Sequence, residues 1–179
     1  MPCLAIAYAF GAVWVVAADE TLTRLDPGSL RPTGAVANVA QSVEHYEPKI
    51  AVGDDALWVA DAVSNSVARV DPVGLRVTRR VAKGGAGVAV GSSGIWSTDS
   101  FGSVWRVADG RQAKVRTGAG AVDVAAGGGF LWVVNRFAGT LVRVDPRALR
   151  VTETIHLRGS PIAVAYGDGY LAVAVRAST

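Results

Sequence analysis

The sequence predicts an all-β fold: a β-propeller arc of about four and a half four-stranded antiparallel blades. Three observations support this prediction. Short apolar segments that end in tryptophan recur about 40 residues apart, turn-forming glycine and Asp-Pro pairs recur in phase with them, and no segment shows a helical hydrophobic period. Positions that recur together along a whole chain are typical of a repeat architecture rather than of an irregular domain.

The tryptophans mark one strand of each repeat. The repeated segments end at Trp14, Trp58, Trp96 and Trp132, and Ala172 takes the same place in a fifth copy. A glycine lies five positions earlier in the last four copies, at Gly53, Gly91, Gly127 and Gly167. We expect each tryptophan to pack between adjacent blades as a structural anchor, with Trp132 well buried and Trp14 less so, because the first blade has fewer neighbours.

The last two copies show the strand order most clearly. Residues 162–166 form an inner strand a, 130–134 strand b, 140–144 strand c and 151–157 an outer strand d that alternates apolar and polar residues. Gly167-Asp168-Gly169 and Asp145-Pro146 separate strands, since glycine tolerates positive φ and proline cannot continue a ladder. Arg143, like its counterparts in the other copies, is expected to complete the turn after strand c.

Composition excludes several classes of protein. Of the 179 residues, 50% are hydrophobic and 18% are charged, which excludes a disordered or coiled-coil chain. The one cysteine, Cys3, excludes a disulfide framework, and a net charge of +3 does not require a nucleic-acid partner. The uncharged run from Pro2 to Ala18 lacks the basic start of a secretory signal and fits a strand pair, so the sequence indicates no transmembrane segment and no particular compartment.

Residues 127–146 carry the repeat in its fullest form: Gly-Gly-Gly-Phe-Leu-Trp-Val-Val-Asn-Arg-Phe-Ala-Gly-Thr-Leu-Val-Arg-Val-Asp-Pro. This pattern resembles the YVTN/NHL-type propellers, in particular the group related to streptogramin (virginiamycin) B lyase. The resemblance extends over essentially the whole chain and implies the propeller fold. It says little about activity, because proteins that share the blade motif differ in function.

Relatives of this kind usually close rings of six or seven blades, whereas this chain is expected to form one partial domain over residues 1–179. The expected blades span about 3–46, 47–84, 85–119 and 120–159, with a half blade at 160–179. The open ends of such an arc would expose apolar surface. We therefore expect a piece of a larger ring, with a small closed ring or an oligomer as alternatives.

Residues that break the repeat are the candidate ligand contacts. Lys49 and Asp123 lie nine positions before their anchors, near the start of the inner strand, where other copies have small residues. Inner strands line the channel of a propeller, so we expect both side chains there, as a ligand-binding pair or as part of a solvated channel mouth. The loops between strands b and c reach the same face and add Asp61, Asp99, Phe101, Asn135 and Arg136.

An insertion between the first two blades, residues 41–48, also reaches that face. It adds His45 and Tyr46 to the candidate ligand contacts. Glu44, His45 and Glu47 could hold a divalent metal, and a solvated loop is the alternative. No other cofactor is expected.

These residues favour a non-catalytic module that recognises a small molecule, a peptide or a partner domain at the channel mouth. The resemblance implies an alternative, a fragment of a streptogramin B lyase-like enzyme that uses a divalent metal such as magnesium and a histidine base. Only His45 lies near the expected face, so no catalytic residue is assigned. A passive scaffold is the third possibility. Basic rim residues such as Arg79 and Arg80 are expected mainly to prevent edge-to-edge aggregation.

Overall fold

The computed structural model describes residues 3–41, 47–53, 55–107 and 113–177. Within these ranges the chain forms five antiparallel sheets and no helix, and hence no helix long and apolar enough to cross a membrane. Four sheets have four strands, and the last has two. The prediction of an all-β propeller arc is therefore confirmed.

Each sheet is called a blade here and is numbered in chain order. Blade 1 contains β1 (Cys3–Ala9), β2 (Ala12–Ala17), β3 (Leu22–Leu25) and β4 (Pro32–Val36). Blade 2 contains β5 (Lys49–Gly53), β6 (Ala56–Asp61), β7 (Ser66–Asp71) and β8 (Arg76–Val81). Blade 3 contains β9 (Gly87–Gly91), β10 (Gly94–Asp99), β11 (Ser103–Arg106) and β12 (Lys114–Arg116). Blade 4 contains β13 (Ala121–Gly127), β14 (Phe130–Asn135), β15 (Thr140–Asp145) and β16 (Arg150–His156), and blade 5 contains β17 (Ser160–Gly167) and β18 (Tyr170–Arg176).

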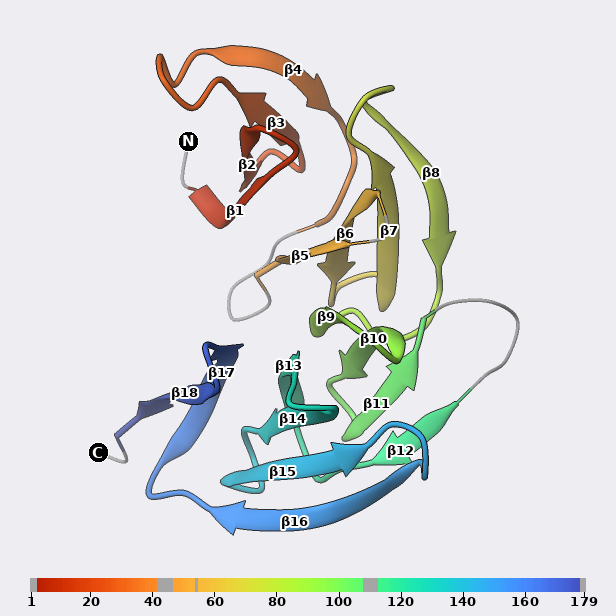
Figure 1. Cartoon of the computed structure of the whole chain (residues 1–179), viewed down its shortest axis with the longest axis vertical. Coiled ribbons are helices and arrows are strands. Elements are labelled where there is room, and N and C mark those ends of the chain that lie inside the picture. Colours follow the sequence, from red (N-terminus) through yellow and green to blue (C-terminus); the bar gives the residue numbers. More distant parts are fainter. Residues whose placement is uncertain (1–2, 42–46, 54, 108–112, 178–179) are drawn as a thin grey trace.

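The blades follow one another around an arc, as Figure 1 shows. The first strand of blades 2 to 5 lies toward the centre, and the fourth strand of each complete blade lies at the outside. Successive inner strands pack on each other: β1 on β5, β5 on β9, β9 on β13 and β13 on β17. This order brings the starts of several inner strands together around a central space.

The tryptophans hold adjacent blades together by packing forward onto the next blade. Trp14 shares a buried cluster with Leu57 and Val59 of blade 2, and Trp96 shares one with Val124 and Leu131 of blade 4. Trp58 packs in the same way with Val88 and Ile95 of blade 3. Large aromatic side chains supply much of the apolar area that such interfaces remove from water.

The expected order of burial along the chain was wrong. Trp14 in the first blade is 0% exposed, whereas Trp132 is only partly buried. The reason is the direction of packing. Trp14 contacts a complete blade 2, but Trp132 packs with Val164, Leu171 and Val173 of the two-stranded blade 5.

The recurrent glycines let neighbouring inner strands approach each other closely. A Cβ placed on Gly91 would lie 2.7 Å from the Cβ of Ala126 in the next blade, which is closer than real Cβ atoms come. Gly53 meets Val90 and Gly127 meets Tyr166 in the same way, while Gly167 has no neighbour within 4 Å. The glycine that precedes each tryptophan by five positions therefore serves the contact between blades.

The recurrent arginines connect strands c and d rather than completing the turn between them, which corrects the expectation. The Arg143 Nε donates to Thr152 Oγ1 at 3.1 Å, and Arg24 Nε donates to Thr33 Oγ1 at 2.9 Å. The turn itself is fixed by the aspartate: Asp145 Oδ1 accepts the backbone N–H groups of Arg147 and Ala148 at 2.8 and 3.0 Å. Such Asx turns satisfy backbone donors that a tight turn leaves without a ladder partner.

Candidate functional site

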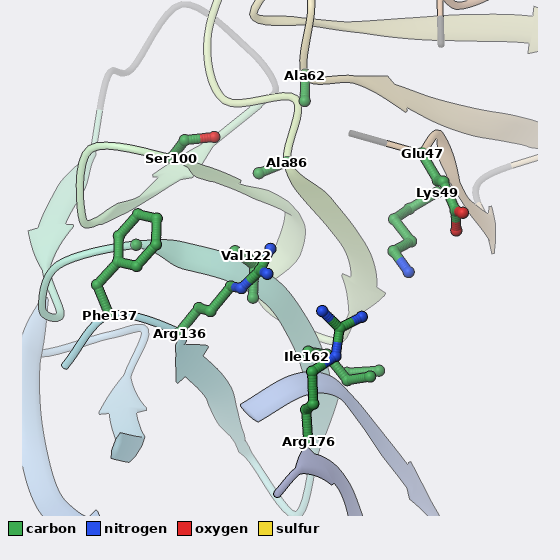
Figure 2. Close-up of a pocket in the computed structure, with 12 residues that line it drawn as sticks. Glu47, Lys49, Ala62, Ala86, Ser100, Val122, Arg136, Phe137, Ile162 and Arg176 are labelled. Atoms are coloured by element: carbon green, nitrogen blue, oxygen red, sulfur yellow. The ribbon is translucent and has the colours of Figure 1, made fainter. Parts of the chain in front are cut away.

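A pocket of about 420 Å³ opens where the inner strands begin. Its lining residues come from blades 2 to 5, at the end of the central space where the inner strands begin, and we call it the channel-mouth pocket. Figure 2 shows most of the lining side chains. Starts of inner strands and the segments just before them contribute Glu47, Lys49, Ala86, Gly120, Val122, Ile162 and Ala163. The ends of strands b, and the loops that follow them, contribute Ala62, Ser100, Arg136, Phe137 and Arg176.

The loop residues of the pocket occupy one repeated place in the sequence. Ala62, Ser100, Arg136 and Arg176 each stand four positions after the tryptophan slot, which we call the mouth position. It lies just beyond the paired part of β6, β10 and β14 and at the end of β18. The blades thus present equivalent residues to one space, and only blades 4 and 5 place an arginine there.

Three cationic side chains converge on the pocket. Lys49 extends from β5 toward the Arg176 guanidinium, and Arg136 reaches into the same space from the loop after β14 (Figure 2). None of the three forms an ion pair with a carboxylate of the described residues. Glu47 is the acidic residue among the described side chains that line the pocket.

Asp123 does not line this pocket, contrary to the expectation that it pairs with Lys49 in the channel. Its side chain is buried between blades 4 and 5, where Oδ2 accepts the Val164 N–H at 3.0 Å and Oδ1 accepts the Val124 N–H at 3.0 Å. Burial raises the pKa of Asp123 above its ordinary value, while the Val164 hydrogen bond and the charge of Lys49 act in the opposite direction. Asp123 therefore joins two blades.

Asp61 and Asp99, predicted as ligand contacts, are buried and already hydrogen-bonded. Asp61 Oδ1 accepts the N–H groups of Val63 and Ser64, and its Oδ2 accepts the Ser64 hydroxyl at 2.6 Å. Asp99 Oδ1 accepts the Ser103 N–H at 2.9 Å, and Oδ2 accepts Trp105 Nε1–H at 2.6 Å. These carboxylates cap the loops between strands b and c and do not line the pocket, and their role as ligand contacts stays a prediction.

Asn135 has the same structural role in blade 4. Its Oδ1 accepts the Thr117 hydroxyl at 3.0 Å, and its Nδ2 donates to the Thr117 carbonyl at 3.0 Å and to Thr140 Oγ1 at 3.1 Å. The side chain is 0% exposed, so it ties the loop after β14 to the connection between blades 3 and 4. Asn135 does not line the pocket, and its role as a ligand contact stays a prediction.

The remaining predicted contacts have different outcomes. Phe101 is 82% exposed and does not line the pocket, whereas Phe137, its counterpart in blade 4, is 74% exposed and does. His45 and Tyr46 lie outside the described residues. Lys49 and Arg136 line the pocket, so their ligand-binding role stays a prediction that the geometry allows.

Sequence reasoning missed Arg176 and Ile162. The repeat held the signal for Arg176, since it stands at the mouth position of blade 5 as Arg136 does in blade 4. Ile162 occupies the place of Val122 one blade later. Neither residue breaks a pattern within its own blade. Only a comparison of equivalent positions across blades would have selected them.

The described residues contain no group of three or more His, Cys, Asp or Glu side chains that could hold a metal ion. His156, an exposed residue, lies at the end of β16 on the outside of blade 4. Of the suggested metal ligands, Glu44 and His45 lie outside the described residues, and Glu47 lines the pocket.

Comparison with solved structures supports the architecture. Hydrazine synthase from Kuenenia stuttgartiensis superimposes with a TM-score of 0.78 at 24% identity over 96% of this chain. The glutaminyl cyclase from Myxococcus xanthus superimposes with a TM-score of 0.57 at 11% identity, over 93% of this chain and 82% of its own. Both have β-propeller-like folds. The chain spans about half of the hydrazine synthase chain, 55% of it.

These likenesses show the fold alone, because the identities are low and one fold serves many functions. The sequence matches no protein-family model and no curated protein.

Proposed function

We propose that this propeller arc is a non-catalytic binding module whose ligand, a small molecule or a segment of a peptide or partner protein, occupies the channel-mouth pocket. The observation that carries the proposal is the convergence of side chains from four blades on one pocket of about 420 Å³. Pockets of this size, with apolar walls and a few convergent polar groups, are typical ligand sites.

The different roles of the repeated residues and the pocket residues within each blade support the proposal. Repeated residues are used for structure: tryptophans and glycines pack blades together, and Asp61, Asp99 and Asn135 cap loops. The pocket residues at the mouth position differ from blade to blade, and their side chains form no hydrogen bond or ion pair with the described residues. Residues with no structural role that gather in a concave site are the usual carriers of binding.

The streptogramin B lyase-like alternative rests on the sequence resemblance. It requires a general base near the pocket. His156 is on the outside of blade 4, and the segment with His45 lies outside the described residues. We favour binding because the described pocket presents cations and apolar groups, and such a site needs no metal cofactor to attract a ligand.

A fragment screen by ligand-observed NMR tests the proposal. We expect hits whose binding is weakened about tenfold by Phe137→Ala or Arg136→Ala, because both side chains line the pocket. Both side chains face solvent at least in part, so the melting temperature should hardly change.

Arg79→Ala is the matched control, because Arg79 is an exposed arginine of β8 at the outer rim. Hits that bind the Phe137 and Arg136 variants normally but are lost in the Arg79 variant would disprove the proposal and place binding at the rim.

A further inference from the structure

The charge of the channel-mouth pocket is unbalanced. Lys49, Arg136 and Arg176 come from blades 2, 4 and 5, and among the described lining residues only Glu47 opposes them. Like charges that share a partly enclosed space repel each other, and an anion placed among them relieves that repulsion. The second nearby acid, Asp123, is directed to the Val164 N–H and does not line the pocket.

Two arginines outside the pocket, Arg80 and Arg143, use their guanidinium groups within the structure. Arg80 donates to Ser66 Oγ and to the carbonyls of Asn38 and Val39, at 3.2, 2.9 and 3.1 Å. Arg143 contacts Thr152 and forms an ion pair with Glu153 at 3.2 Å. The guanidinium groups of Arg136 and Arg176, by contrast, form no hydrogen bond or ion pair with the described residues. Their donors are available to a ligand.

The residue types suit an oxyanion. A guanidinium offers paired N–H donors that match two oxygens of a carboxylate or a phosphate, and a lysine adds a compact positive charge. Figure 2 shows the Lys49 ammonium and the two guanidinium groups directed into one space, so a single headgroup can be approached from several sides.

The rest of the pocket suits a compact apolar body. Val122, Ile162 and Phe137 provide apolar surface beside the cations, and Ala62, Ala86 and Ala163 leave room between the blades. Phe137 is 74% exposed, so it presents ring surface that a ligand would cover.

We propose that the pocket binds small molecules in which a carboxylate or phosphate group is attached to an apolar or aromatic body, with the anionic group held by Lys49, Arg136 and Arg176 and the body against Phe137 and Ile162. This inference rests on the binding function proposed above and names its ligand class.

Titration calorimetry with four probes tests the inference: phenyl phosphate, benzoate, inorganic phosphate and benzamide, the neutral analogue of benzoate. We expect phenyl phosphate and benzoate to bind at least about tenfold more tightly than benzamide, and their affinity to fall as salt rises from about 20 to about 300 mM. Comparison of phenyl phosphate with benzoate tells which oxyanion the site prefers, and inorganic phosphate measures the headgroup alone.

Variants locate the charge effect. Arg136→Gln and Arg176→Gln should each weaken the binding of both aromatic anions about five- to tenfold. Glu47→Gln should strengthen it about twofold, because it removes the opposing charge of the pocket. Arg79→Gln, at the exposed rim, should leave it unchanged.

The outcomes separate this inference from the function on which it rests. If benzamide binds as tightly as benzoate and both lose affinity in Phe137→Ala, the pocket is a ligand site but the inference about anions is wrong. If neither aromatic anion binds, the inference is wrong, and the fragment screen decides the broader proposal. If Arg79→Gln abolishes binding and the pocket variants do not, both are wrong.

Discussion

The interface between blades 1 and 2 and the interface between blades 4 and 5 use the same sequence pattern with different results. In the first, Trp14 is 0% exposed and its cluster includes residues of both β6 and β7. In the second, Trp132 is only partly buried against a blade that consists of β17 and β18. The contribution of an anchor thus depends on the blade that follows it, because each tryptophan packs forward.

The glycines repeat this contrast. Gly91 and Gly127 lie against Ala126 and Tyr166 of the next blade, but Gly167 has no atom of another blade within 4 Å of its Cβ position. Conversely, Tyr8 of β1 occupies the same place in the repeat as Tyr166 and is 69% exposed. The same residue type therefore makes a structural contact where it faces another blade, and it is exposed or without a neighbour where no described blade lies against it.

The largest expected effect compares two tryptophans. Trp14→Ala should lower the free energy of unfolding by about 3–5 kcal/mol, the usual range for deletion of a large buried aromatic side chain. Trp132→Ala should cost clearly less, because part of the indole is already in contact with water. Chemical denaturation followed by circular dichroism measures both, and a greater loss for Trp132→Ala would refute forward packing.

The second prediction compares two glycines with the same place in the repeat. Gly91→Ala should destabilise the protein by about 1–3 kcal/mol, the usual cost of overpacking, because the new methyl group would collide with the Cβ of Ala126, which cannot rotate away. Gly167→Ala is the matched control and should stay within about 0.5 kcal/mol of wild type. Similar melting temperatures for the two variants would contradict the close approach of β9 and β13.

The smallest effect concerns pH and the blade 4–blade 5 interface. Burial raises the folded-state pKa of Asp123 above 3.8, so the folded protein binds more protons than the unfolded chain between 3.8 and that raised value. This acid therefore makes the protein less stable as pH rises through that window, although Lys49 and the Val164 N–H reduce the effect.

Asp123→Asn removes this titration. Relative to wild type, the stability of the variant should increase as pH rises above 3.8 and level off above the raised pKa, when melting temperatures are measured from about pH 4 to about pH 8. A difference that does not change with pH would show that Asp123 has the same pKa in the folded and unfolded states.

The repeat made the fold predictable from the sequence, because tryptophan, glycine and Asp-Pro recur in phase and each has a physical reason to do so. It could not give the burial of Trp132, which depends on how many strands the next blade contributes. Strand periodicity also identified Lys49 and Arg136 as residues near the channel mouth, since the start of an inner strand and the loop after strand b meet at the same end of a blade.

The structural roles of individual polar residues were less predictable from the sequence. Asp61, Asp99 and Asn135 were predicted as ligand contacts because they are polar and expected in loops. Their hydrogen bonds show a loop-capping role that sequence spacing did not reveal. Asp123 stands where Lys49 does, nine positions before an anchor, yet one side chain turns toward β17 and the other into the pocket. Sequence spacing fixes a position in the strand but not the partner of the side chain.

The mouth position has a consequence for how binding specificity can change. Asp61, Asp99 and Asn135 fix the path of the backbone, and the residue directly after each of them, Ala62, Ser100 or Arg136, lines the pocket. The residue that caps the loop and the residue that lines the pocket are thus neighbours in sequence but occupy separate positions of the repeat. A charged residue in place of Ala62 or Ser100 would change the charge of the pocket and leave the capping hydrogen bonds of Asp61 and Asp99 in place. Under the binding function proposed above, ligand preference can therefore change one blade at a time.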